Sequence, residues 1–364
     1  MRRREFLQTT GALASAALVP GVARAQAGFD PKPGAWRSFE VTTRVEIAKP
    51  AGVARAWIPL PLDDADYQRA LSTDRTGNAV RADIVSDGRY GARMVYAEWA
   101  ASEKAPVIEV TSRFSTRDRA VTFGKPITGE RLSAADVAFF TAPTQLIPTD
   151  GIVRKTALEA TRGARTELEK ARGIYQWIVV NTFRDPKVRG CGVGDIKSML
   201  EVGNLGGKCA DLNALFVGMA RSLGIPARDV YGVRVAKSAF GYRSLGAGTE
   251  NITRAQHCRA EVFLAGYGWV PVDPADVRKV VLEEKDKPTT LADPIVPPVR
   301  EKLFGAWEMN WLAYNTAHDV KLPGSDAAPL GFFMYPQAET RAGLLDCLDP
   351  DNFRYRITAR AISV

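Results

Sequence analysis

The chain has 364 residues, of which 46% are hydrophobic and 25% are charged, and its formal net charge at pH 7 is +8. This composition is typical of a globular protein and excludes a wholly disordered chain. The length is enough for one large core or for two or three modules. The positive charge is small and spread along the chain, so we expect no nucleic-acid partner.

Residues 1–25 have the pattern of an export signal. Basic residues at positions 2–4 precede an apolar run, and Ala23-Arg24-Ala25 fits a cleavage site. Arg3-Arg4 followed by Phe6-Leu7 resembles the twin-arginine signal, which carries folded proteins across the bacterial inner membrane. Cleavage would remove four arginines and one glutamate and leave a charge of about +5.

No other segment reaches the roughly 18 continuous apolar residues that a membrane-spanning helix needs. We therefore expect a periplasmic or secreted protein with no stable membrane insertion once the signal is cleaved. The alternative is that residues 1–25 stay attached as an N-terminal anchor.

Residues 30–130 are predicted to form an N-terminal β module resembling a sandwich. Hydrophobic and polar residues alternate along its segments, and turn signals such as Asp87-Gly88 separate them. On the first segment, one face carries Phe39, Val41, Thr43, Val45 and Ile47.

Residues 133–280 change to a helical period and then return to strands. Thr166 and Glu169 form a capping-box pair at the start of one helix. A second helix has an apolar stripe from Leu212 and ends where Gly224 precedes a proline. Strand patterns follow from about residue 228, so the region predicts an α+β fold with helices packed on a sheet.

Two further segments complete the chain. Residues 281–302 are charged and then rich in proline, which is typical of a linker. Residues 303–364 are predicted to form a C-terminal β segment.

Four cysteines, at positions 191, 209, 258 and 347, could in principle form disulfides in an oxidising compartment. They show no CxxC spacing, and a chain of this length does not need cross-links to be stable. Free or catalytic thiols are therefore at least as well supported as disulfide bridges.

Cys209 is the candidate nucleophile. It follows Gly206-Gly207 and Lys208 and lies in the first turn of the predicted helix, where the glycines allow close backbone approach and unusual φ angles. Unsatisfied N–H groups and the helix dipole at that end favour thiolate over thiol. The alternative is a small buried cysteine at the start of a core helix.

His257 is the candidate base. It lies on a predicted strand whose opposite face carries Cys258 and other apolar residues, so its side chain points away from that face. The next strand ends at Asp273. A three-residue turn at 264–266, with Gly266 left-handed, would place Asp273 directly opposite His257, whereas a four-residue turn would put them on opposite faces.

Other residues compete for roles in this site. Asp276 is the rival of Asp273 as the carboxylate that orients the imidazole, but it lies beyond Pro274 rather than at the end of the strand. His318 has no cysteine near it in the sequence and is interpreted as structural or exposed. Trp269 could wall the site, although a core or edge position fits it better.

A metal site that uses Cys209, Asp211 and His257 is a further alternative. These residues lack the paired spacing of zinc ligands. No cofactor motif is present either, so we predict neither a metal nor a cofactor.

The stretches "GGKCADLNALFVGMARSLGIPARDVYGVRV" and "HCRAEVFLAGYGWVPVDPAD" resemble the transglutaminase-like superfamily of papain-fold proteins. The resemblance covers roughly residues 150–280 and implies a papain-like core in which Cys209, His257 and Asp273 form the catalytic triad. More loosely, the flanking β segments resemble those of bacterial exported members.

The resemblance implies a cysteine enzyme that acts on amide bonds of peptides or proteins, by hydrolysis or by transfer to an amine, with hydrolysis favoured. In its mechanism Cys209 attacks the acyl carbon, and its own backbone N–H is one oxyanion donor. The alternative function is a periplasmic binding or assembly module that uses the same fold as a scaffold. Substrate identity and oligomeric state do not follow from the sequence.

Overall fold

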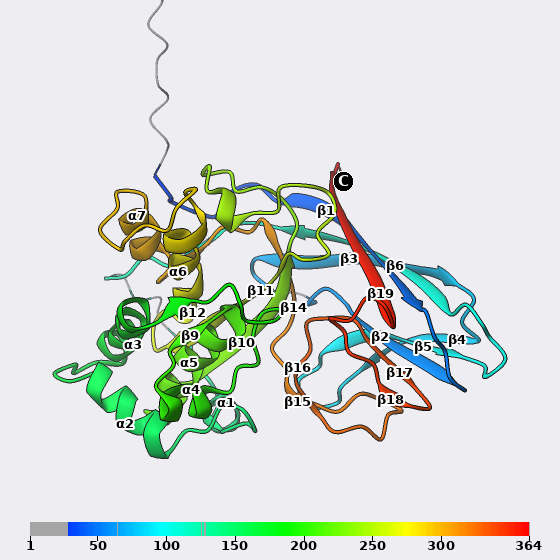
Figure 1. Ribbon diagram of the computed structural model, residues 1–364. Helices are drawn as coiled ribbons and strands as arrows, with labels where there is room; N and C mark the ends of the chain where they lie inside the picture. The colour runs from blue at the N-terminus through cyan, green and yellow to red at the C-terminus, as the bar shows by residue number, and fades with distance from the viewer. Residues whose placement is uncertain (1–27, 64, 125, 127–128, 364) are drawn as a thin grey trace, which may run out of the picture.

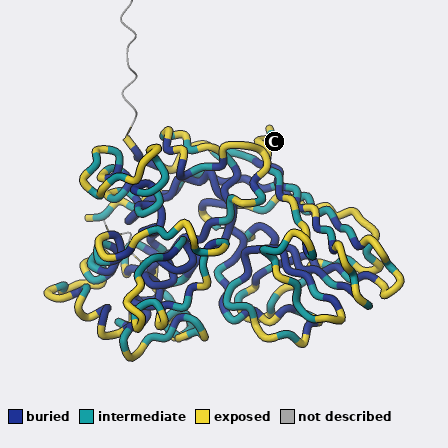
Figure 2. Tube along the Cα trace, viewed as in Figure 1, coloured by how far each residue is buried: buried dark blue, intermediate teal, exposed yellow. Residues whose placement is uncertain are grey.

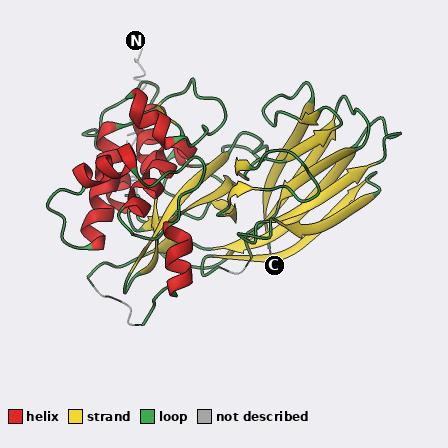
Figure 3. Ribbon diagram, turned by 90° about the horizontal axis from the view of Figure 1, so that it is seen from below, coloured by secondary structure: helices red, strands yellow, loops and turns green. Residues whose placement is uncertain are grey.

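The computed structural model describes residues 28–63, 65–124, 126 and 129–363 (Figure 1). The predicted export signal at 1–25 lies outside the described residues. Most helices gather at one end of the molecule and the long strands of a β-sandwich at the other (Figure 3). None of the described helices combines the length and apolarity that crossing a membrane requires.

Helix α5 (Cys209–Ser222) is the centre of the helical part, and every one of its residues is buried. Such a helix is apolar around most of its circumference because neighbours cover all its faces. Around it lie α1 (Ala134–Thr141), α2 (Gly151–Ala160), α3 (Glu167–Asn181), α4 (Ile196–Val202) and α6 (Pro274–Glu283). Helix α7 (Val296–Lys302) and the 3₁₀ turn η1 (Arg243–Leu245) pack against α6. The predicted capping box is present at α3, where the Thr166 hydroxyl accepts from the Glu169 N–H and the Glu169 carboxylate accepts from the Thr166 N–H.

A four-stranded antiparallel sheet, here called the core sheet, packs against α5. Its strand order is β12 (Gly268–Val272), β11 (Gln256–Leu264), β10 (Ala227–Arg234) and β14 (Trp311–Asn315). The even-numbered residues of β11, from Cys258 to Leu264, join the same hydrophobic cluster as α5. The predicted α+β core, with helices on an antiparallel sheet, is therefore confirmed.

The β-sandwich has two antiparallel sheets with a hydrophobic core between them. The first contains β19 (Phe353–Ile362), β1 (Arg37–Ile47), β6 (Val107–Thr116) and β3 (Gln68–Gly77) in that order. The second contains β18 (Gly343–Leu344), β17 (Gln337–Thr340), β2 (Ala54–Pro59), β5 (Arg93–Trp99) and β4 (Arg81–Ser86). Three further sheets have two short strands each: β13 (Ala306–Trp307) with β7 (Arg119–Ala120), β15 (His318–Val320) with β16 (Leu330–Phe332), and β8 (Phe183–Arg184) with β9 (Gly206–Gly207).

Both ends of the chain build this sandwich. Strand β19 pairs with β1 from Ser38↔Ile362 to Ile47↔Phe353, and β17 pairs with β2. The strand-rich N-terminal region is as predicted, but the C-terminal segment does not form a separate β unit. It completes the two sandwich sheets and also supplies β14 to the core sheet.

The segment 281–302 differs from a plain linker. It contains the end of α6 and all of α7, whose first turn includes two prolines. Proline is tolerated there because the first helical N–H groups have no intrahelical acceptor. The charged and proline-rich composition of residues 281–302 therefore did not indicate the short helix that they contain.

A hydrophobic cluster joins the sandwich to the core sheet. It contains Phe39 from β1, Phe114 from β6, Ile357 from β19 and Leu312 from β14, all buried. Buried segments are visible in both parts of the molecule (Figure 2). Because the two sheets share this cluster, the sandwich is a fixed wall beside the core rather than a loosely tethered module.

We predict that Ile357→Ala lowers the free energy of unfolding by about 2–5 kcal/mol, because it leaves a cavity between the two sheets. Arg356→Ala is the matched control, since Arg356 is exposed on the same strand and should change the stability by less than about 0.5 kcal/mol. Urea unfolding followed by tryptophan fluorescence measures both. Equal, small effects of the two variants would contradict the shared cluster.

Candidate active site

Cys209 is the first residue of α5 and is 3% exposed. The two preceding glycines form β9, which runs parallel to β8. A Cβ at Gly206 would collide with the Phe183 ring, and one at Gly207 would lie 2.7 Å from the Asp211 Cβ. The close approach that the glycine pair permits is therefore present, whereas neither glycine has a positive φ.

A buried carboxylate, Asp211, fixes the loop that faces the start of α5. It accepts hydrogen bonds from the N–H groups of Val193 (3.0 Å), Gly194 (2.9 Å) and Lys208 (2.9 Å). Gly192 has a φ of +94°, and a Cβ there would collide with this carboxylate. The loop is thus held so that the Cys191 carbonyl oxygen accepts from the Ala210 N–H at 2.9 Å.

The surroundings of Cys209 favour its thiolate. Hydrogen bonds from the thiols of Cys191 and Cys258 lower its pKa well below the usual value, and His257 adds to this effect against the opposing cost of burial. The positive end of α5 acts in the same direction. The pKa of Cys191 is raised in turn by its hydrogen bond to Cys209, and burial raises that of Cys258, so one thiol of the three is activated.

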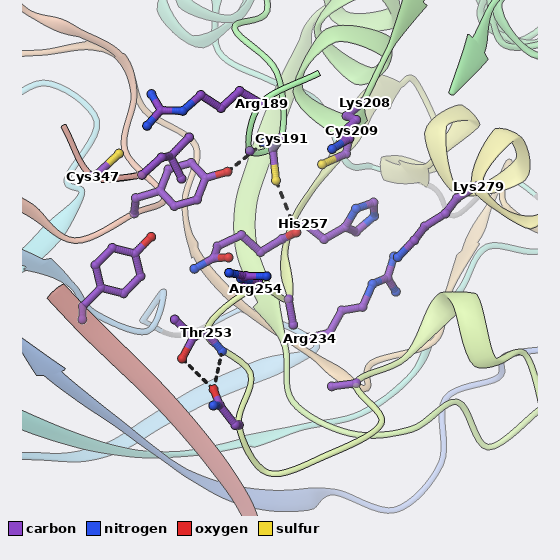
Figure 4. A pocket seen from close by; sticks show the side chains of 18 of the residues that line it. Arg189, Cys191, Lys208, Cys209, Arg234, Thr253, Arg254, His257, Lys279 and Cys347 are labelled. Atoms are coloured by element: carbon purple, nitrogen blue, oxygen red, sulfur yellow. Dashed lines mark hydrogen bonds between the residues drawn. The ribbon is translucent and has the colours of Figure 1, made fainter. Parts of the chain in front are cut away.

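All four cysteines of the protein are free thiols in the structure. The proton of Cys191 has two acceptors within reach, the Cys209 sulfur and the Gln256 carbonyl oxygen at 3.3 Å from Cys191 Sγ (Figure 4). The Cys191 N–H donates to the Tyr335 hydroxyl at 2.9 Å, which connects the sandwich side of the molecule to this loop.

His257 lies near the start of β11 and is 3% exposed. Its Nε2 is 2.7 Å from Asp273 Oδ2, so Nδ1 is the ring nitrogen left for the Cys209 thiol. The Trp311 indole donates to the His257 carbonyl oxygen at 2.9 Å. Burial and the Arg234 guanidinium oppose a charged ring, but Asp276 and Asp273 outweigh them and raise the pKa of His257.

Asp273 lies where β12 turns into α6, and it is completely buried. Its Oδ1 accepts from the Asp276 N–H at 3.0 Å, which caps the helix, and from the Asn213 amide at 3.3 Å. Asn213 also donates to the Cys258 carbonyl oxygen at 2.7 Å. Asn213 thereby ties α5, one turn beyond Cys209, to the strand that carries the histidine.

The β11–β12 hairpin has a different register from the predicted one. Its loop is 265–267, Leu264 pairs with Gly268, and Gly266 is left-handed with a φ of +80°. The last pair of this register is Ala260↔Val272, so one step further Arg259, rather than His257, would lie across from position 273. Because strand faces alternate with a period of two, an offset of two residues keeps His257 and Asp273 on the same face.

Asp276, the rival carboxylate, is engaged elsewhere. Both of its oxygens accept from Arg234 Nη2, at 2.6 and 2.7 Å, and Oδ2 is 3.4 Å from His257 Nε2. Although burial opposes it, Arg234 and His257 lower the pKa of Asp276. Asp273 is therefore the carboxylate that directly bonds the imidazole, and Asp276 contributes charge from behind.

Two buried guanidiniums balance these two carboxylates. Arg259 Nε lies 3.7 Å from Asp273 Oδ2, and burial together with Arg234 lowers the pKa of Arg259 to about 10. Its guanidinium also stacks on the rings of Trp307 and Trp311. A buried ion network of this kind is costly to break, because removal of one member leaves another charge unpaired.

The donors for a metal ion are already used by protein groups. The alternative set of Cys209, Asp211 and His257 fails because Asp211 binds three backbone N–H groups. Ligand atoms of His257, Asp273 and Asp276 do lie within 4.8 Å of one another. Arg234, however, supplies a fixed positive charge at Asp276, so this arrangement fits an ion-pair network better than a cation site.

His318 and Trp269 lie outside the candidate site. His318 is buried, with Nε2 3.3 Å from Asp229 Oδ2 and Nδ1 3.4 Å from the Tyr231 hydroxyl. Trp269 packs edge-on against Phe140 and carries the Arg228 guanidinium 3.9 Å above its ring. Neither residue lines the cavity beside Cys209.

A cavity of about 660 Å³ opens beside Cys209 and His257. One wall comes from the core and includes Lys208, Arg234 and Lys279, and the opposite wall comes from the C-terminal part of the sandwich, including Leu348 and Tyr355. Figure 4 shows the labelled core residues around the sulfur and the imidazole. The Cys209 N–H donates no hydrogen bond to any described residue, so it can bind an oxyanion in this cavity.

The supporting roles of three residues were missed by sequence reasoning, although Asp211 had been considered as a metal ligand. Asp211 at the third helical position had a signal, because an acid there commonly caps the helix start. Asn213, four residues after Cys209, shares its helix face. Arg234 had no sequence signal, since its partner Asp276 is 42 residues away.

Comparisons with known proteins agree with this architecture. The model of the transglutaminase-like superfamily matches residues 154–274. An uncharacterised protein of Haemophilus influenzae is 36% identical over 346 residues, which are 89% of this chain and 91% of that protein.

One solved structure shows the same fold. A candidate cysteine protease from Cytophaga hutchinsonii aligns with a TM-score of 0.56 at 13% identity and covers 92% of this chain and 93% of that chain. The periplasmic domain of TgpA from Pseudomonas aeruginosa aligns over 70% of this chain and 93% of its own, at 14% identity and a TM-score of 0.32. The family match at residues 154–274, the relative that aligns over most of the chain and the fold shared with the Cytophaga protein together show that the chain belongs to the transglutaminase-like superfamily.

Proposed function

We propose that this protein is an exported cysteine-dependent hydrolase that cleaves amide bonds in peptides or proteins. In this proposal Cys209 is the nucleophile, His257 the general acid and base, and Asp273 the carboxylate that orients the imidazole. The observation that carries it is a thiol of lowered pKa at a helix N-terminus, beside a histidine whose Nε2 is bound by a buried aspartate.

The chemistry follows from these positions. The Cys209 thiolate attacks the acyl carbon of the substrate amide, and the Cys209 N–H stabilises the oxyanion that forms. The imidazolium of His257 donates a proton to the leaving amine, which leaves an acyl-enzyme. His257 then takes a proton from water as it attacks the thioester, and Cys209 is released.

The charge of the cavity supports water over an amine as the acyl acceptor. Six cationic side chains line the cavity, and none of the lining residues is Asp or Glu. A lysine substrate is protonated at neutral pH and would be repelled from such a cavity. Water is uncharged and is not repelled, so hydrolysis is favoured over transamidation.

We expect Cys209→Ser to lower amide hydrolysis at least about 10³-fold, because a serine hydroxyl in this setting is a far weaker nucleophile. Mass spectrometry of peptide mixtures, with and without an added amine, detects cleavage or transfer products. Unchanged thermal unfolding of the variant shows that its fold is intact. If no product depends on Cys209 across broad peptide panels, the scaffold function replaces the enzymatic one.

Asp273→Asn should reduce turnover by about 10²–10⁴-fold, because an amide keeps the helix cap but does not stabilise the imidazolium. Ser198→Ala is the matched control, as it removes a hydrogen bond from the exposed start of α4. Steady-state kcat/KM measures both variants. Equal losses would mean that Asp273 acts only through stability.

Alkylation of Cys209 by iodoacetamide should persist well below pH 8, since its lowered pKa keeps the thiolate until the pH falls through that value. Cys347 lines the same cavity with a pKa raised by burial, so it should react only at higher pH. His257→Gln removes one stabilising partner and should move the Cys209 profile to higher pH. Peptide mapping by mass spectrometry gives the rates, and similar profiles for the two cysteines would contradict the activation.

Replacement of Arg3 and Arg4 by lysine should leave uncleaved precursor in the cytoplasm, because the twin-arginine pathway requires the arginine pair. Cell fractionation with immunoblotting measures this outcome. Normal cleavage and export of the variant would mean that the protein uses the route for unfolded chains.

A further inference from the structure

The cavity beside Cys209 has walls of opposite character. Every cationic residue in it comes from the core: Arg184, Arg189, Lys208, Arg234, Arg254 and Lys279. The wall from the C-terminal segment contributes apolar and aromatic side chains, among them Leu348, Pro350 and Phe353. A ligand that fits both walls carries negative charge on one side and apolar groups on the other.

Carboxylates neutralise the cationic wall only in part. Arg184 and Lys279 share Glu283, Arg189 pairs with Asp346 and Arg234 with Asp276. None of these carboxylates lines the cavity. Within the described part of the chain, Lys208 and Arg254 form no salt bridge, so the cavity keeps an excess of positive charge.

Lys279 is placed as a receptor for an anion. Its side chain is 18% exposed, and its Nζ lies 3.8 Å from its acidic partner, at the outer limit of an ion pair. Burial and the neighbouring Arg234 lower the pKa of Lys279, so positive charge on this amine is costly. A carboxylate in the cavity would offset that cost.

These cations surround the reacting groups instead of forming a distant patch. Lys208 directly precedes Cys209, and Arg254 lies three residues before His257 on the segment leading into β11. Figure 4 shows Lys208 next to Cys209, and shows Arg254 and Lys279 on different sides of His257. A group bound by Lys208 or Arg254 would therefore be close to the scissile amide.

We propose that the substrate is an acidic peptide with a carboxylate next to the scissile amide, bound by Lys208 or Arg254, in a cavity to whose positive charge Lys279 adds. This inference rests on the proposed function for the cleavage step, but the binding preference can be measured without cleavage. The carboxylate can be a Glu or Asp side chain or the C-terminal group of the peptide.

The first test compares the alkylation of Cys209 by iodoacetate and by iodoacetamide, two reagents of similar size that differ by one negative charge. Relative to N-acetylcysteine amide, iodoacetate should be favoured at Cys209 by about tenfold or more at low ionic strength. The double variant Lys208→Gln/Arg254→Gln should lower this preference about fivefold or more, and added salt should lower it as well. Peptide mapping by mass spectrometry gives both rates.

Arg162→Gln is the matched control, because it removes an exposed positive charge from the turn after α2, outside the cavity. It should leave the preference for iodoacetate unchanged. Equal effects of Arg162→Gln and the double variant would mean that the preference depends on the net charge of the protein and not on the cations of the cavity. Absence of any preference would overturn the proposal.

The second test measures protection of Cys209 from iodoacetamide by three peptides. Acetyl-Ala-Glu-Ala-amide carries an internal carboxylate, acetyl-Ala-Gln-Ala a C-terminal one, and acetyl-Ala-Gln-Ala-amide none. Protection by one of the first two and not by the neutral peptide identifies the source of the carboxylate. Equal protection by all three contradicts the proposal.

The two hypotheses fail in different ways. Selective protection without any hydrolysis would keep the anion-binding cavity and reject the proposed enzyme. Hydrolysis that depends on Cys209 but is indifferent to acidic residues would keep the enzyme and reject the acidic substrate.

Discussion

One buried carboxylate, Asp273, connects the elements that form the candidate site. Its Oδ1 caps α6 and accepts from Asn213 on α5, while its Oδ2 bonds His257 on β11. A charge with no exposure to water is stabilised only if each lone pair finds a donor. Because these donors come from separate elements, the helix start, the strand and the turn into α6 must reach their positions together.

The need to compensate a buried charge also accounts for the two arginines that pair with the buried carboxylates of the site. Asp273 and Asp276 lie close together, and Arg234 and Arg259 balance them from two directions. Arg259 packs over the rings of two neighbouring tryptophans, which keeps its guanidinium in place. This arrangement holds His257 in one orientation, with Nε2 bound and Nδ1 free for the thiol, before any substrate arrives.

The sandwich has a role in the site as well as in stability. Strand β19 closes the first sandwich sheet, and the segment just before and within it forms the apolar wall of the cavity. Tyr335, from the chain leading into β17, accepts a hydrogen bond from the Cys191 N–H. The C-terminal part of the chain therefore shapes access to a site whose reactive groups all come from the core.

The sequence by itself determined the local features: the capped helix α3, the stripe of α5, the strand face of His257 and a left-handed Gly266. Each depends on residues a few positions apart, and the periodicity of side chains records it. It also nominated Cys209, His257 and Asp273, which the structure brings to one place. The tertiary structure decided the hairpin register, the division of labour between Asp273 and Asp276, and the pairing of both chain ends in one sandwich. The hairpin register depends on where its three-residue loop begins, and the alternation of strand faces is the same for an offset of two residues. The other two features depend on pairings between residues far apart in the chain, Arg234 with Asp276 and β1 with β19, and no local pattern encodes them.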